Sequence, residues 1–95
     1  MEKKDKHQVL QYVHAACEEV IDSIKKAQNV RVHGDAWHAI MDYMNIEFGK
    51  AIGARTALHI AGQDVSEFDD LLEVVAVHVK AEDDRAAPFF EPDEA

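Results

Sequence analysis

The chain has 95 residues, of which 47% are hydrophobic and 31% are charged, and it carries a net charge of −9. A chain of this length forms one small domain, and its hydrophobic content excludes a protein that is disordered throughout. No apolar run is long enough to span a bilayer and the start, MEKKDKHQ, lacks the apolar core of a signal peptide, so we expect a cytoplasmic protein without membrane contact.

The charge is distributed unevenly along the chain. Residues 1–62 carry eight acidic and eight basic side chains, whereas residues 63–95 carry eleven acidic side chains against Lys80 and Arg85. The whole net charge therefore lies in the last third of the chain. Such a segment repels phosphates, which argues against direct nucleic-acid binding and favours a protein partner with a basic surface.

The first predicted element is a helix over residues 5–28. Asp5 is placed to cap it, and Lys25 and Lys26 suit the negative end of the helix dipole. Its apolar residues recur at helical spacing: Val9, Leu10, Val13, Cys17, Val20, Ile21 and Ile24. Cys17 is the only cysteine, which excludes an intrachain disulfide, and its place on the apolar face predicts a buried side chain.

A loop over residues 29–34 is expected to lead into a long helix over residues 35–61, with Asp35 as its cap. One stripe of this helix repeats every seven residues, with large side chains at the positions between: Trp37, Met44, Ala51 and Leu58, together with Ile40, Met41 and Phe48. A break at Gly49 is the alternative, but the stripe keeps its phase across that glycine. We therefore predict one continuous helix around which the fold is organised.

A second series of small and apolar residues lies on another side of the same helix. Its members are Ile46, Gly49, Gly53, Ala57 and Ile60. A ridge of small residues allows another helix to approach closely, and this close packing has to offset about 1 kcal/mol for each glycine in a helix interior. Two apolar stripes require two partners. We therefore expect this series to form an interface between copies of the chain.

A third helix is predicted after Gly62, starting near Ser66 with Asp69 three residues later. Phe68, Leu71, Leu72, Val75 and Val79 share one helical face. The valines of residues 74–79 also favour a strand, which could pair with residues 30–33. The predicted fold is thus all-α, a small bundle of three helices completed by oligomerisation, with an α+β fold containing a short two-stranded element as the alternative.

Residues 83–95 form an acidic tail containing Pro88 and Pro92, which we separate from a helical domain over residues 1–82. Phe89 and Phe90 lie inside this acidic frame and are candidates for anchoring a partner, since adjacent exposed phenylalanines are otherwise disfavoured.

The sequence offers little support for an active site or a bound cofactor. Six histidines occur, but their spacing provides only weak pairs and no HExxH or Glu-x-x-His motif, so we predict no metal site. Two acidic clusters on helices are the exception: Glu18, Glu19 and Asp22, and Glu67, Asp70 and Glu73. Acidic clusters that face each other across a bundle can hold Mg²⁺ against the phosphates of a nucleotide.

The segment EFDDLLEVV over residues 67–75 resembles the ExxD motif of the MazG-like all-α nucleotide pyrophosphatases, and residues 18–22 resemble a version of their preceding ExxE with Asp22 in place of the usual glutamate. The resemblance implies a Mg²⁺-dependent nucleotide pyrophosphatase, which is our alternative function.

Our leading interpretation is a non-enzymatic acidic module for protein–protein interaction, for example an inhibitor or regulator whose carboxylates occupy the basic groove of a nucleic-acid-binding protein. The residues expected to bind that partner are Glu67, Asp69, Asp70, Glu73, Glu82, Asp83, Asp84, Phe89 and Phe90. Small acidic inhibitors encoded by phages act in this general way, and the sequence is compatible with such an origin.

Overall fold

The computed structural model describes the backbone of residues 3–89 and the side chains of residues 5–88. It contains three α-helices, α1 (Lys3–Ala27), α2 (Asp35–Ile60) and α3 (Ser66–Ala86), followed by a short 3-10 turn, η1 (Ala87–Phe89). No strand occurs among these residues. The predicted all-α fold is confirmed, and the α+β alternative is wrong.

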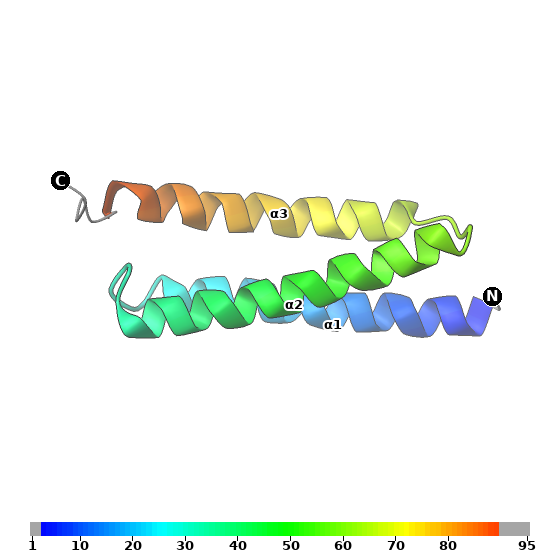
Figure 1. Cartoon of the computed structure of the whole chain (residues 1–95), viewed down its shortest axis with the longest axis horizontal. Coiled ribbons are helices and arrows are strands. Elements are labelled where there is room, and N and C mark those ends of the chain that lie inside the picture. Colours follow the sequence, from blue (N-terminus) through cyan, green and yellow to red (C-terminus); the bar gives the residue numbers. More distant parts are fainter. Residues whose placement is uncertain (1–2, 90–95) are drawn as a thin grey trace.

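The three helices run lengthwise past one another in a particle that measures 54 × 23 × 17 Å (Figure 1). α1 packs along both of the other helices, whereas α2 and α3 approach each other closely at few positions. The radius of gyration of the molecule, 15.7 Å, exceeds the roughly 13 Å of a compact domain of 100 residues. The fold is therefore an elongated bundle with a thin core.

α2 is one continuous helix that passes through Gly49 without a break, as its apolar phase predicted. Trp37, Met44, Ala51 and Leu58 are all buried, and so is Met41. Ile40 and Phe48 pack against this core from partly buried positions. The first apolar stripe is thus confirmed as the surface that α2 contributes to the core.

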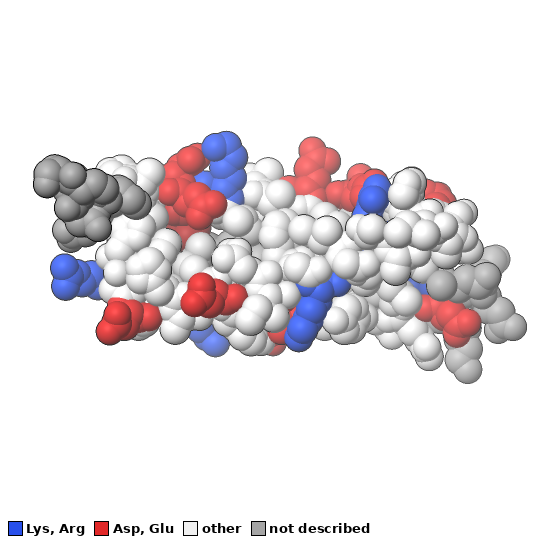
Figure 2. Space-filling view, in the orientation of Figure 1, with Lys and Arg blue, Asp and Glu red and all other residues white. Residues whose placement is uncertain are grey.

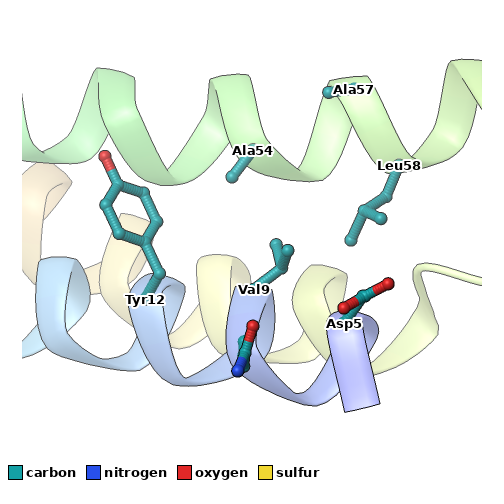
Figure 3. A pocket seen from close by; sticks show the side chains of 7 residues that line it. Asp5, Val9, Tyr12, Ala54, Ala57 and Leu58 are labelled. Atoms are coloured by element: carbon teal, nitrogen blue, oxygen red, sulfur yellow. The ribbon is translucent and has the colours of Figure 1, made fainter. Parts of the chain in front are cut away.

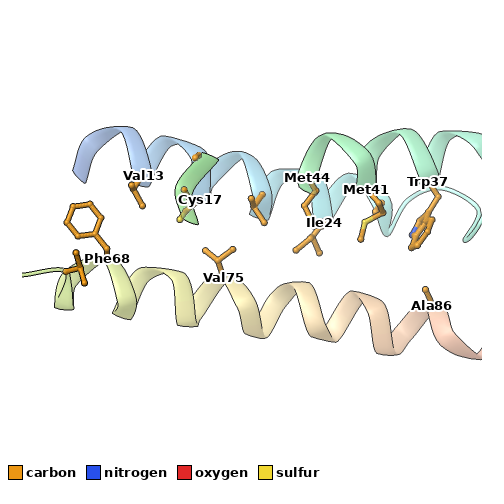
Figure 4. Packing of buried hydrophobic residues seen from close by; sticks show 14 of the residues in the cluster. Val13, Cys17, Ile24, Trp37, Met41, Met44, Phe68, Val75 and Ala86 are labelled. Atoms are coloured by element: carbon orange, nitrogen blue, oxygen red, sulfur yellow. The ribbon is translucent and has the colours of Figure 1, made fainter. Parts of the chain in front are cut away.

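The core is one cluster that runs the length of the bundle, between α3 on one side and α1 with α2 on the other (Figure 4). α1 contributes Val13, Cys17, Val20 and Ile24, and α3 contributes Phe68 and Val75. Phe68 and Val20 are fully enclosed, and Cys17 is buried as predicted. The valines of α3 therefore follow the helical pattern of the segment despite their preference for strands.

The helix ends differ from prediction in detail. Gly34, not Asp35, is the cap of α2, and Asp35 is the first helical residue, where its charge still suits the positive end of the helix dipole. At the start of α3 the Asp64 carboxylate accepts hydrogen bonds from the backbone N–H of Ser66, at 3.0 Å, and from its hydroxyl, at 2.6 Å. The Asp64 carboxylate thus holds Ser66, the first residue of α3.

The turn between α2 and α3 depends on Gly62, whose φ of 81° lies in the left-handed region. At the other end, α3 continues past Glu82 to Ala86, so helical structure extends into the segment predicted as a tail. Phe89 lies in η1, its side chain lies outside the described part, and Phe90 lies outside the described residues altogether.

Candidate functional site

The acidic residues predicted to bind a partner lie on α3, and all but one are exposed. Asp70, Glu73 and Asp84 are exposed on the outward side of α3, and Glu67, Asp69 and Asp83 are exposed beside them. Figure 2 shows acidic side chains along the upper edge of the molecule, where α3 lies. Val74 and Val77 stand among them, 60% and 65% exposed. The outward side of α3 is therefore acidic with an apolar centre.

Two of these carboxylates already pair with a base of the same chain. The Arg55 guanidinium donates to both Asp69 oxygens, at 2.7 and 3.3 Å, across the turn between α2 and α3. Lys80 pairs with Asp84 at 3.3 Å, one helical turn away. Neither pair is buried, so each adds little to stability in water. The hydrogen bond from Arg55 nevertheless lowers the pKa of the Asp69 carboxyl.

A groove of about 410 Å³ between α1 and α3 adjoins this acidic surface. Its apolar lining comes from both helices: Cys17, Ile21, Leu71, Val74 and Val75. Glu18 and Asp22 line it from α1, together with His14 and Lys25. Val74 also lines a smaller depression with Asp70, Glu73 and Val77, so the groove continues onto the outward side of α3. We call this surface, groove and depression together, the acidic groove.

Sequence reasoning did not find the acidic groove, because it depends on which helices become neighbours. In the alternative function, Glu18, Glu19 and Asp22 would face Glu67, Asp70 and Glu73 across the bundle. Among the described residues, no three histidines, cysteines or acids come together in a way that could hold a metal ion. Only part of each cluster lies at the acidic groove: Glu18 and Asp22 from α1, and Asp70 and Glu73 from α3. Glu19 instead accepts a hydrogen bond from Tyr43 of α2, and Glu67 lines a separate depression near the start of α1.

Glu82 was predicted to bind a partner with the other acids of α3. This prediction is wrong, because its side chain is buried and cannot contact a partner. Trp37 Nε1 donates to its Oε2 at 3.0 Å. Arg85 donates from Nε to Oε1 at 2.8 Å and from Nη2 to Oε2 at 2.6 Å. Both carboxylate oxygens are therefore satisfied inside the protein, as a buried charge requires.

Glu82, Trp37 and Arg85 form a cluster, which we call the Glu82 cluster, that joins all three helices at one end of the bundle. Arg85 Nη2 also lies 3.4 Å from the carbonyl oxygen of Ala27, the last residue of α1. His33, in the loop before α2, lies with a ring nitrogen 3.1 Å from the Ala86 carbonyl, and its ring is 4.8 Å from that of Trp37. His33 has a φ of 62°, which is uncommon outside glycine. These contacts indicate a structural role for the cluster.

The hydrogen bond from Arg85 lowers the pKa of the Glu82 carboxyl, and the bond from Trp37 acts in the same direction, while burial opposes both. A carboxyl whose pKa is lower in the folded state contributes stability above its ordinary value, here 4.5, and loses it as the pH falls toward the folded value.

We expect the free energy of unfolding to decrease as the pH is lowered below about 4.5. Urea unfolding of the wild type and of Glu82→Gln at a series of pH values measures this effect. The difference in free energy of unfolding between the wild type and Glu82→Gln should be largest near neutral pH and should become smaller in acid. A constant difference would mean that ionised Glu82 adds nothing to folding.

The second predicted series on α2 is exposed in the single chain. Ile46 is 59% and Ile60 79% exposed, and Gly49, Gly53 and Ala57 are exposed between them. A Cβ atom added at Gly49 or Gly53 would meet no atom within 4 Å. No described helix of the same chain therefore packs against Gly49 or Gly53, at the centre of the series that we predicted as an oligomer interface.

A second groove, of about 420 Å³, lies between the start of α1 and the end of α2 (Figure 3). Val9 and Tyr12 line it from α1, and Ala54, Ala57 and Leu58 line it from α2. Ala57 belongs both to this groove and to the exposed series. The apolar surface of α2 thus extends from the glycines toward α1.

No described helix is long and apolar enough to cross a membrane. Comparisons with known protein families, with curated proteins and with solved structures found no match to this chain.

Proposed function

We propose that the chain is a non-enzymatic protein-interaction module whose acidic groove binds a basic surface of a protein partner. The observation that carries this proposal is the combination, on one side of the molecule, of exposed acids of α3 with an apolar groove against α1. Apolar side chains supply most of the binding energy at protein interfaces, while surrounding charges select the partner and speed its association.

The shape and charge of the acidic groove suit an amphipathic basic helix. Val74 and Leu71 can receive the apolar side of such a helix, and Asp70 and Glu73 stand where its lysines or arginines would lie. Surfaces that bind nucleic acids carry such basic residues, which supports the more specific proposal of an inhibitor or regulator whose carboxylates stand in for phosphates.

We expect Asp70→Asn with Glu73→Gln to weaken binding about fivefold to tenfold at low salt, because two charges at the groove are lost while the apolar lining stays intact. The affinity should be measured for a partner recovered from the native host, at several salt concentrations. The wild-type affinity should fall as salt rises, and the variant should show a smaller dependence on salt.

The matched control replaces two exposed acids of α2, Asp35 and Asp42, by asparagine. This control removes the same net charge from another part of the surface. It should bind almost as tightly as the wild type. Equal affinity of all three proteins across the salt series would contradict the proposed role of the acidic groove.

A further inference from the structure

The outward side of α2 is an apolar surface that the chain itself leaves uncovered. Between Glu47 and Asp64 the only charged residues are Lys50 and Arg55. Arg55 pairs with Asp69 of α3, and Lys50 pairs with Glu47 at 3.0 Å. Figure 2 shows few charged side chains over the C-terminal half of α2. A helix side that carries so few charges is normally covered by another element.

No contact among the described residues requires glycine at positions 49 and 53 of α2. In a helix interior each is less stable than alanine by about 1 kcal/mol. Alanine would fit at both Gly49 and Gly53, since an added Cβ would touch no atom within 4 Å. Glycine at these positions is explained if another helix approaches the backbone there.

We propose that this surface binds the same surface of a second copy, with the two α2 helices antiparallel and a two-fold axis passing beside Gly53. The spacing of the exposed residues is symmetric about that glycine. Ile46 and Ile60 are each seven positions from it, and Gly49 and Ala57 are each four positions from it. A two-fold axis requires a self-complementary surface of this kind.

In this arrangement the residues at the same level of the two helices are compatible in size. Gly53 lies against Gly53 of the second copy, and Gly49 lies level with Ala57, so the backbones can come close. Ile46 lies level with Ile60 at each end, where two exposed apolar side chains cover each other. The paired segment, residues 46–60, is about 21 Å long at 1.5 Å per residue.

Charge and symmetry both favour a second copy of the chain as the occupant. Lys50 lies level with Thr56 of the second copy, so no like charges oppose each other along the paired segment. The surface is also self-complementary about Gly53, which an occupant of another sequence would not require.

This inference does not rest on the proposed function, because the residues that line the acidic groove all belong to α1 and α3. A dimer formed through α2 leaves that groove open on each copy. Failure of the partner-binding experiment would therefore leave the dimer intact as an inference, and the reverse is also true.

Single cysteines on α2 test both the interface and its register. Under mild oxidation, Gly53→Cys should form a disulfide-linked dimer by itself, because the axis brings the two copies of residue 53 together. Ile46→Cys should not cross-link to itself, since its two copies lie about 21 Å apart. A mixture of Ile46→Cys and Ile60→Cys, refolded together, should cross-link.

The wild type is the control for these reactions, because its only thiol, Cys17, is buried and should not cross-link. Self-linking of Ile46→Cys without linking in the mixture would contradict the antiparallel pairing about Gly53. Absence of cross-links from every variant would contradict the interface itself.

Gly53→Leu separates the interface from folding. The site is open in the single chain, and leucine is a better helix former than glycine, so helix content and cooperative unfolding should be retained. The variant should sediment as a monomer at concentrations where the wild type is dimeric. A variant that stays dimeric would overturn the proposal.

Discussion

Replacement of Glu82 by alanine is expected to lower the free energy of unfolding by about 2–4 kcal/mol, because it removes the acceptor of three hydrogen bonds at the end of the bundle. The buried Trp37 N–H would lose its partner, and the Arg85 guanidinium would lose its counter-charge. For a domain of this size the melting temperature should fall by about 10–20 °C. Thermal unfolding followed by circular dichroism measures the change.

Asp83→Ala provides the matched control, because Asp83 is the next residue of α3 and its side chain is exposed. Its replacement should change the free energy of unfolding by no more than about 0.5 kcal/mol. If Glu82→Ala were as stable as Asp83→Ala, the Glu82 cluster would not hold the three helices together.

Replacement of Met44 by alanine is expected to cost about 2–5 kcal/mol, since Met44 is 1% exposed in the middle of the buried stripe of α2. The loss comes from the apolar contacts of the removed atoms and from the cavity they leave in a thin core. Urea unfolding at low protein concentration measures it without a contribution from self-association.

Two further replacements test whether this loss of stability comes from the burial of Met44. Met44→Leu keeps the volume and should cost less than about 1.5 kcal/mol. Ile46→Ala, two residues along the same helix but on the exposed side, should affect folding of the single chain little. Equal losses for Met44→Ala and Ile46→Ala would show that α2 does not have one buried and one exposed apolar side.

The fold could be predicted from sequence where a pattern repeats over many residues. The seven-residue repeat from Trp37 to Leu58 identified both the continuity of α2 across Gly49 and its buried side. The same reasoning kept α3 helical despite its valines, because Phe68 and Val75 share a side of a helix. A repeating pattern combines the weak preferences of many residues, so a few residues that favour a strand do not change the prediction of a helix.

Predictions for single residues failed where the partner lies elsewhere in the chain. Glu82 was assigned to the surface by its charge, although it continues the seven-residue spacing of Phe68 and Val75 and therefore belongs to the buried side of α3. A second signal was present in Trp37, because a buried indole N–H needs an acceptor. The sequence could suggest that Trp37 needs a buried acceptor, but not that this acceptor is Glu82, because the two residues are 45 positions apart.

The acidic groove illustrates the same division between local and distant information. The charge of α3 is visible in the sequence, and so are the acids of α1. Their position at the edges of one groove depends on α1 packing against both other helices, which the apolar pattern of a single helix does not specify. Likewise, the pairing of Asp69 with Arg55 follows from the turn between α2 and α3.

α2 has two apolar sides: its own chain covers one, and we propose that a second copy of the chain covers the other. Sedimentation equilibrium of the unmodified protein over a range of concentrations decides whether α2 pairs in this way. We expect a particle of twice the 10.7 kDa mass of one chain, which dissociates on dilution. A particle of 10.7 kDa at every concentration would contradict it.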